Sequence, residues 1–123
     1  MELNNVKLTK EVIQETHDVI YKLTCNLRNQ VRNEMKERKE LIIPSDICDY
    51  DVSTSISYDG GNHPEYASDC FAQIESIEWS EKCDDVVIHT EHGDMYICDC
   101  NVDDVFTIAE LVLFLITEYP QKS

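Results

Sequence analysis

The feature that most constrains the fold is a long run of helical periodicity near the start of the chain, over residues 9–39. Thr9 is a suitable N-cap, because its hydroxyl can accept a hydrogen bond from an amide of the first turn. The helix must end before Pro44, since a residue that precedes proline is driven toward extended geometry. One stripe recurs along this stretch at spacings of three and four residues, and it is formed by Val12, Thr16, Val19, Ile20, Leu23, Leu27, Val31 and Met35.

Beyond this helix the apolar period shortens to two, which predicts β-strands. Residues 51–58 alternate cleanly between serines on one side and larger side chains on the other. Three further strands are expected over residues 70–80, 86–90 and 95–100, and Leu41–Ile43 can add a short extended piece ahead of them.

The last expected element is a helix over residues 102–119, with Asp103 or Asp104 capping its positive end. Between residues 105 and 116 only Thr107 and Glu110 are polar. A helix that is apolar on nearly every side is either buried in the core or packed partly on a partner.

The expected order is therefore α-β-β-β-β-α in a single domain over residues 1–123. Short connections favour an antiparallel four-stranded meander, with the long N-terminal helix and the apolar C-terminal helix packed on it as a two-layer α+β fold. No stretch approaches the roughly 20 apolar residues of a membrane span. The first residues lack the layout of a signal peptide, so we expect a cytoplasmic protein.

The net charge of −15 is distributed very unevenly along the chain. Residues 1–40 hold eight Lys or Arg and seven Asp or Glu, which gives +1. Residues 41–123 hold only Lys82 and Lys122 against eighteen acids, which gives −16. A surface of this sign attracts basic partners and disfavours direct binding of nucleic acid.

Eight of the acids fall on or between the last three expected strands, where a rigid sheet could present them as an array that imitates a nucleic-acid backbone. We therefore expect an inhibitor or regulator that binds a basic, nucleic-acid-binding protein surface. The eight candidate partner-binding residues are Glu75, Glu78, Glu81, Asp84, Asp85, Glu91, Asp94 and Asp99.

An alternative is an oligomeric structural or regulatory module without nucleic-acid mimicry. Its interface would come from the long first helix and from the apolar segment 105–116. The sequence leaves both alternatives open.

A zinc-binding protein is the third hypothesis. If His92-Gly93 is the two-residue turn of the last hairpin, His89 lies opposite Tyr96 and on the same face as Cys98. Cys100 would share that face, and His and Cys are the usual zinc ligands. The pattern lacks the paired CxxC spacing of strong zinc motifs, so we expect no cofactor and two small buried side chains instead. All six cysteines are expected to be free thiols.

The loop DGGNHPEY, residues 59–66, supplies two more candidates, His63 and Tyr66. Gly60 and Gly61 give the backbone the freedom for a reversal, so a structural connection explains most of this loop. The sequence contains no nucleophile elbow or phosphate-binding loop. We therefore expect no enzymatic activity.

The stretch YDGGNHPEYAS, followed by SIEW and by a hairpin ending in HTEHGDMY, resembles small acidic proteins carried by phages and mobile elements of Bacteroidetes-type bacteria. The resemblance covers residues 56–112 and implies no catalytic residue. It implies a regulator or inhibitor of host defence, such as an anti-CRISPR or anti-restriction protein.

Overall fold

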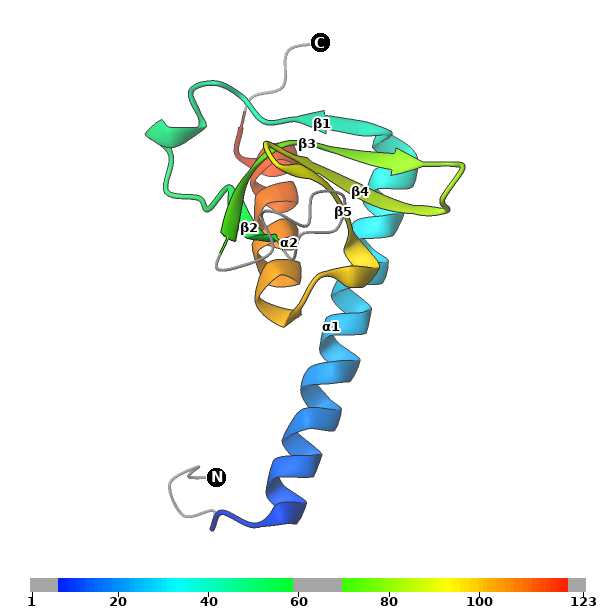
Figure 1. Cartoon of the computed structure of the whole chain (residues 1–123), viewed down its shortest axis with the longest axis vertical. Helices are drawn as coiled ribbons and strands as arrows, with labels where there is room; N and C mark the ends of the chain where they lie inside the picture. The colour runs from blue at the N-terminus through cyan, green and yellow to red at the C-terminus, as the bar shows by residue number, and fades with distance from the viewer. Residues whose placement is uncertain (1–6, 59–69, 120–123) are drawn as a thin grey trace.

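The structure is a computed structural model that describes residues 7–58 and 70–119 (Figure 1). Helices and antiparallel strands are both present, which confirms the α+β class. The elements in chain order are α1 (Lys10–Arg38), β1 (Glu40–Ile42), the 3-10 turn η2 (Ile47–Asp49), β2 (Ser55–Tyr58), β3 (Cys70–Ser80), β4 (Asp85–Thr90), β5 (Gly93–Tyr96), the 3-10 turn η4 (Ile97–Asp99) and α2 (Val102–Thr117).

The sheet has five strands, where four had been expected, and the long strand β3 is its centre. Both β1 and β2 pair with β3, each along a different part of it, while β4 and then β5 follow on the other edge. The expected antiparallel meander is present as β2-β3-β4-β5, and β1 adds a fifth strand to it, because the 11-residue β3 is long enough to accept two short partners on one edge. The register between β3 and β4 shifts between Ile74 and Ser76, which marks a bulge there.

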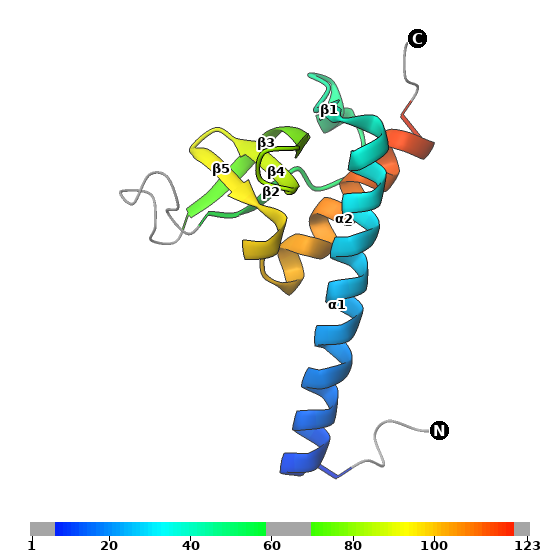
Figure 2. The ribbon, with the colours of Figure 1, turned by 90° about the vertical axis from the view of Figure 1, so that its right-hand side faces the viewer.

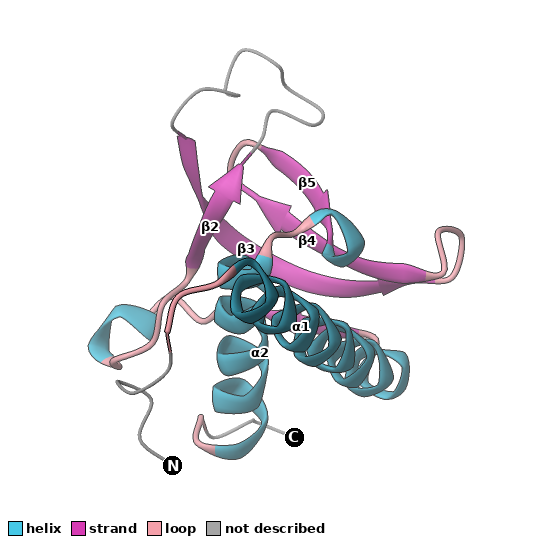
Figure 3. Cartoon of the chain, turned by 90° about the horizontal axis from the view of Figure 1, so that it is seen from below, coloured by secondary structure: helices cyan, strands magenta, loops and turns pink. Residues whose placement is uncertain are grey.

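Both helices cover one face of the sheet, so the fold has two layers (Figures 2 and 3). Strand alternation turns one row of side chains across the sheet toward the helices. Leu41, Ile77, Ile88 and Met95 form that row and are all buried. On the helical side the core is completed by Val31 and Met35 of α1 and by Val105, Ile108, Leu111 and Leu115 of α2.

Only the C-terminal half of α1 packs on the body, and the N-terminal half projects away from it (Figure 1). The first buried residue of the helix is Thr24. A helix of 29 residues is about 44 Å long, whereas the 16 residues of α2 span about 24 Å, so one half of α1 has no layer opposite it. The apolar stripe expected to face one core is thus split between the core and solvent.

The N-cap of α2 is Asn101, and the expectation of Asp103 or Asp104 is wrong. Asn101 accepts a hydrogen bond from the amide of Asp104 at 2.8 Å. The backbone is extended at Asn101, which follows η4, and the helix starts at the next residue, Val102. Asp104 is buried instead, and its carboxylate accepts from the amide of Ser57 in β2.

Neither described helix is both long enough and apolar enough to cross a bilayer.

Candidate interaction surface

The sheet has a second face, which points away from the helices and carries several of the predicted acids. Leu41 is buried between two exposed neighbours in β1, so Glu40 and Ile42 point outward. One outward row runs from Glu40 across Glu78 and Val87 to Tyr96, and the next runs from Ile42 across Ser76 and His89 to Asp94. We call these two rows the outer face.

His89 lies between two carboxylates at the centre of the outer face. Its Nδ1 is 2.7 Å from Oδ1 of Asp94 on β5, and its Nε2 is 2.9 Å from Oε1 of Glu78 on β3. The imidazole therefore joins three neighbouring strands, and in its protonated form it donates from both nitrogens.

Three effects set the pKa of His89. Burial alone would lower it, but hydrogen bonds to Glu78 and then Asp94, together with their negative charges, outweigh burial and raise the pKa above its ordinary value. A protonated His89 cancels one of the two neighbouring charges. The cluster then keeps a net charge of −1, which makes His89 a local counterion within the acidic face.

The turn between β4 and β5 lies one residue earlier than expected, which shifts the pairing of the two strands by two residues. His89 pairs with Asp94, and Glu91-His92 form the turn, so the predicted pairing of His89 with Tyr96 is wrong. The Thr90 hydroxyl causes this closure, because it donates to the Gly93 carbonyl and accepts from the amide of Gly93. The shift in pairing places Asp94, in place of Tyr96, opposite His89.

Three more of the predicted acids contact other residues of the chain. Asp85 is buried and accepts from Nε of Arg32 at 2.9 Å. Glu81 meets Nζ of Lys39 at 3.1 Å and stays exposed. Glu91 accepts from the amide of Gln73. These three acids are therefore not free of contacts within the fold.

The pKa shifts of Asp85 and Glu81 agree with these contacts. Burial would raise the pKa of Asp85, but hydrogen bonds from Arg32, Cys98 and Val86 lower it below its ordinary value. The hydrogen bond from Lys39 lowers the pKa of Glu81. Both carboxylates therefore stay ionised at neutral pH.

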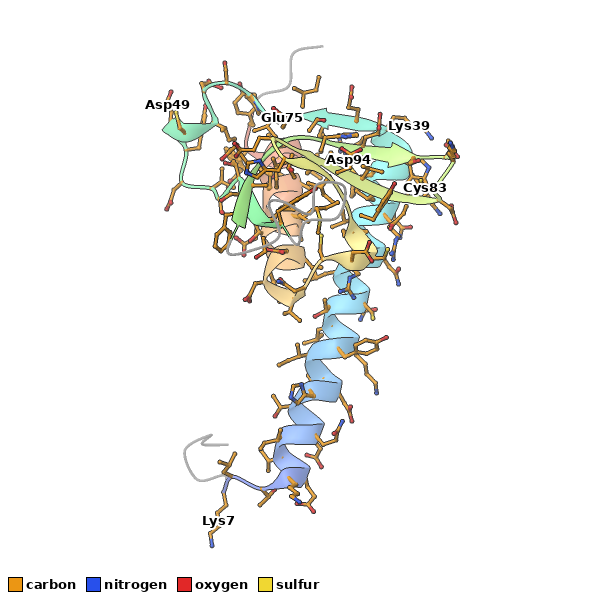
Figure 4. The ribbon with its side chains drawn as sticks, viewed as in Figure 1. Lys7, Lys39, Asp49, Glu75, Cys83 and Asp94 are labelled. Carbon is orange, nitrogen blue, oxygen red and sulfur yellow. The ribbon has the colours of Figure 1, made fainter. Side chains whose placement is uncertain are left out.

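The remaining three predicted acids are exposed: Glu75, Asp84 and Asp99 form no ion pair with any other residue in 7–58 or 70–119. Figure 4 shows Glu75 and Asp94 over the sheet, far from Lys7 at the tip of α1.

Glu40 belongs to the same surface and was missed in the sequence. It lies directly opposite Glu78, and like charges in that position repel. Only its place one residue before the expected extended piece Leu41–Ile43 could have indicated this.

The basic residues lie almost entirely along α1. Among the described residues, every Lys and Arg lies on α1 or next to its ends except Lys82, in the turn between β3 and β4. Arg28 donates to the carbonyls of Ile97 and Cys100, and Lys36 lies over the ring of Trp79. The positive charges thus hold the helix to the body, and the outer face keeps its negative charge.

The other predicted site residues do not form a second site. His63 and Tyr66 lie outside the described residues. The segment with Cys98 and Cys100 is the turn η4 rather than a strand, so Cys98 is exposed while Cys100 is buried, and the two thiols do not share a face. Within 7–58 and 70–119 no three His, Cys, Asp or Glu side chains converge on a point where they could hold a metal ion.

The pKa values of both thiols are raised. Burial, followed by the neighbouring carboxylates, raises the pKa of Cys98 to about 11 and that of Cys100 to about 12. Both stay protonated at neutral pH.

No protein-family model, curated protein or solved structure matches the chain.

Proposed function

We propose that the protein is a non-enzymatic inhibitor or regulator that binds a basic, nucleic-acid-binding protein surface through its outer face. The observation that carries this proposal is the separation of charge between α1 and the sheet. A partner approaching the sheet from outside meets Glu40, Glu78 and Asp94, with His89 between the last two.

Repulsion within the outer face supports the same proposal. Glu40 and Glu78 are directly opposed across β1 and β3, which costs stability in the free protein. A basic surface placed over them would relieve that repulsion. Neighbouring strands lie about 4.8 Å apart, so the carboxylates are close enough to act together on one partner.

Binding of this kind has a defined dependence on salt and on competitors. Electrostatic steering speeds association at low ionic strength and weakens as salt rises. A protein whose nucleic-acid site is occupied by the outer face should also be released by added duplex DNA. A partner bound through an apolar surface should not respond to either treatment.

The test is capture from bacterial lysate on the immobilised protein at low salt, followed by elution with duplex DNA and identification by mass spectrometry. The test variant carries Glu40→Gln, Glu75→Gln and Glu91→Gln, which removes three negative charges on and beside the outer face. The matched control carries Asp49→Asn, Asp51→Asn and Glu118→Gln, which removes three exposed charges elsewhere.

We expect nucleic-acid-binding proteins in the DNA eluate of the wild-type protein and of the control, and their loss from the test variant. An equal loss of capture in both variants would show that only overall charge matters. Wild-type capture by both variants would show that these charges do not contribute. Either result would reject the outer face as the site. Captured proteins that resist DNA competition would reject nucleic-acid mimicry.

A further inference from the structure

The projecting half of α1, residues 10–23, carries an apolar stripe that residues 7–58 and 70–119 leave largely exposed. Val19 is 55% exposed and Leu23 is 54% exposed, although both are large apolar side chains. The stripe runs from Val12 through Thr16, Val19 and Leu23 to Leu27, where the helix reaches the body.

At that point the stripe continues into an apolar groove between α1 and α2. The groove has a volume of about 590 Å³, and Leu27 and Val31 line it from α1. Leu113 of α2 also lines it and is 58% exposed. Phe106, Ala109 and Ile116 complete the apolar wall on α2. In the part of the chain that the structure describes, each copy therefore presents one exposed apolar stretch of helix and one apolar groove.

The projecting half is a weak helix when it stands alone. Isolated helices of fewer than about 12–15 residues are marginal in water, and most helical stability in proteins comes from packing. This half is also rich in β-branched residues, which have modest helix propensity: Val12, Ile13, Thr16, Val19 and Ile20. It needs a surface to pack against.

We infer that a second copy of the chain covers this surface, with the projecting half of each α1 lying antiparallel in the groove of its partner. A twofold axis makes the two contacts equivalent and leaves neither helix nor groove unfilled, so the assembly closes as a dimer. The projecting half is about 21 Å long, and the groove follows α2 from Phe106 to Ile116, about 16 Å.

The helix dipoles set the direction of the second copy. Antiparallel packing opposes the dipoles of the two α1 helices, whereas parallel packing would align them. The bases of residues 24–38 do not add to this choice, because Arg28, Arg32 and Lys36 contact the body of their own chain.

The two lengths also set the register. The projecting half is centred near residues 16–17, and the part of α1 that lines the groove runs from Leu27 to Glu34. Antiparallel packing of one against the other places the twofold axis near Leu23. Leu23 then meets its own copy, while the two Val12 residues lie more than about 30 Å apart.

The first test is the mass in solution, measured by light scattering and sedimentation over micromolar concentrations. The wild-type protein is expected at twice the chain mass. Val19→Glu or Leu113→Glu, which place a charge in the helix or in the groove, should raise the dimer dissociation constant by at least about a hundredfold. A wild-type monomer throughout that range would overturn the inference.

The matched control is Tyr21→Glu. Tyr21 is also exposed on the projecting half, but it lies two residues from Val19 and Leu23 and so on the opposite side of the helix. This variant should remain a dimer. Residues 19 and 21 belong to a part of α1 outside the core, so thermal unfolding of the body should show that both variants remain folded. Equal loss of the dimer in both would overturn the assigned face.

The second test separates the antiparallel dimer from other arrangements. Under mild oxidation Leu23→Cys should form a disulfide-linked dimer, and Val12→Cys should not, relative to the wild-type protein with its native thiols. Cross-linking of both variants would show parallel helices, and cross-linking of neither would reject the proposed register. Recovery of a foreign helical protein on a monomeric chain would show a different occupant and overturn the inference. None of these outcomes depends on the acidic outer face, so the two proposals fail separately.

Discussion

At the scale of single residues, the outer face depends on one imidazole. Glu78 and Asp94 project from strands on either side of β4, and each hydrogen-bonds one nitrogen of His89. A neutral residue at this position would leave two carboxylates near each other without a cation. His89 therefore links the folding of three strands to pH.

Stability should fall as pH rises through the pKa of His89. That pKa is raised in the folded protein, so the stabilisation is fully present below the ordinary pKa of about 6.5 and is lost above the raised value. The effect should be roughly 1 kcal/mol or less, because the cluster is partly exposed to solvent. Urea unfolding between about pH 6 and pH 9 measures it.

The control for this prediction is His89→Gln, which cannot titrate at this position. Its free energy of unfolding should change less over the same pH range. If the wild-type and variant curves are parallel, the cluster contributes nothing to the pH dependence.

Asp104 is the second residue whose ionisation matters. Burial raises its pKa, and hydrogen bonding from Ser57 only partly offsets this. Asp104→Asn keeps the acceptor without a charge to desolvate, so it should leave stability unchanged or slightly higher. Asp104→Ala leaves the Ser57 amide without its partner and should cost roughly 1–3 kcal/mol.

Chemical denaturation of these two variants and of Asp103→Ala decides the point. Asp103 is exposed, so its variant should lie within about 0.5 kcal/mol of the wild-type protein. Equal losses for Asp104→Asn and Asp104→Ala would show that the charge of Asp104, and not its hydrogen bond, stabilises the fold.

At the scale of elements, the two helices begin in different surroundings. Thr9 caps a helix end that projects into solvent, whereas Asn101 caps a helix end that lies between η4 and β2. The cap of α1 therefore stabilises only the local helix, whereas the cap of α2 stabilises a helix that forms part of the core.

Asn101→Ala should lower the free energy of unfolding by about 1 kcal/mol, because the amide of Asp104 loses its side-chain acceptor. Asn101→Asp keeps an acceptor at the N-terminus of α2 and should restore most of the loss. Thermal and urea unfolding provide the measurement. A neutral effect of Asn101→Ala would mean that water replaces the cap at no cost.

At the scale of the whole molecule, the chain has two distinct surfaces. The outer face of the sheet is acidic, while the projecting half of α1 and the groove beside α2 are apolar. One surface suits a basic partner and the other suits a second copy. A dimer formed through α1 would leave both outer faces available.

A net charge of −15 implies repulsion across the whole fold. Raising salt from about 0.01 M to about 0.15 M shortens the Debye length from about 30 Å to about 8 Å. We therefore expect the melting temperature to rise over this range, as measured by calorimetry. Close pairs such as Arg32–Asp85, at 2.9 Å, should be screened much less.

The variant Glu40→Gln, Glu75→Gln and Glu91→Gln provides the comparison, because it changes the net charge from −15 to −12. Its melting temperature should rise less with salt. A fall in melting temperature on adding salt would show that attractive pairs outweigh repulsion in this fold.

Local patterns in the sequence were sufficient to predict most elements. The expected helix over residues 9–39 is observed as Lys10–Arg38, and the expected strand over residues 70–80 is observed as Cys70–Ser80. Periodicity is strong in both segments. Prediction was weaker where a single side chain controls geometry, as at Thr90 in the last hairpin and Asn101 before α2.

The candidate site was predicted only in part. The acids were found, because charge is a property of composition, but the contacts of Asp85 and Glu81 with basic residues of α1 and its end were not. Arg32 and Asp85 are 53 positions apart. Their contact depends on how a helix lies against a sheet, and no local pattern encodes that arrangement.

The sequence by itself determined the elements, the α+β class and the concentration of negative charge after residue 40, because these depend on neighbouring residues and on composition. Only the tertiary structure decided which acids remain unpaired, that His89 lies between Glu78 and Asp94, and that half of the apolar stripe of α1 stays uncovered. The physical reason is that each of these outcomes depends on strand register and on the unequal lengths of the packed layers, which arise only when distant segments meet.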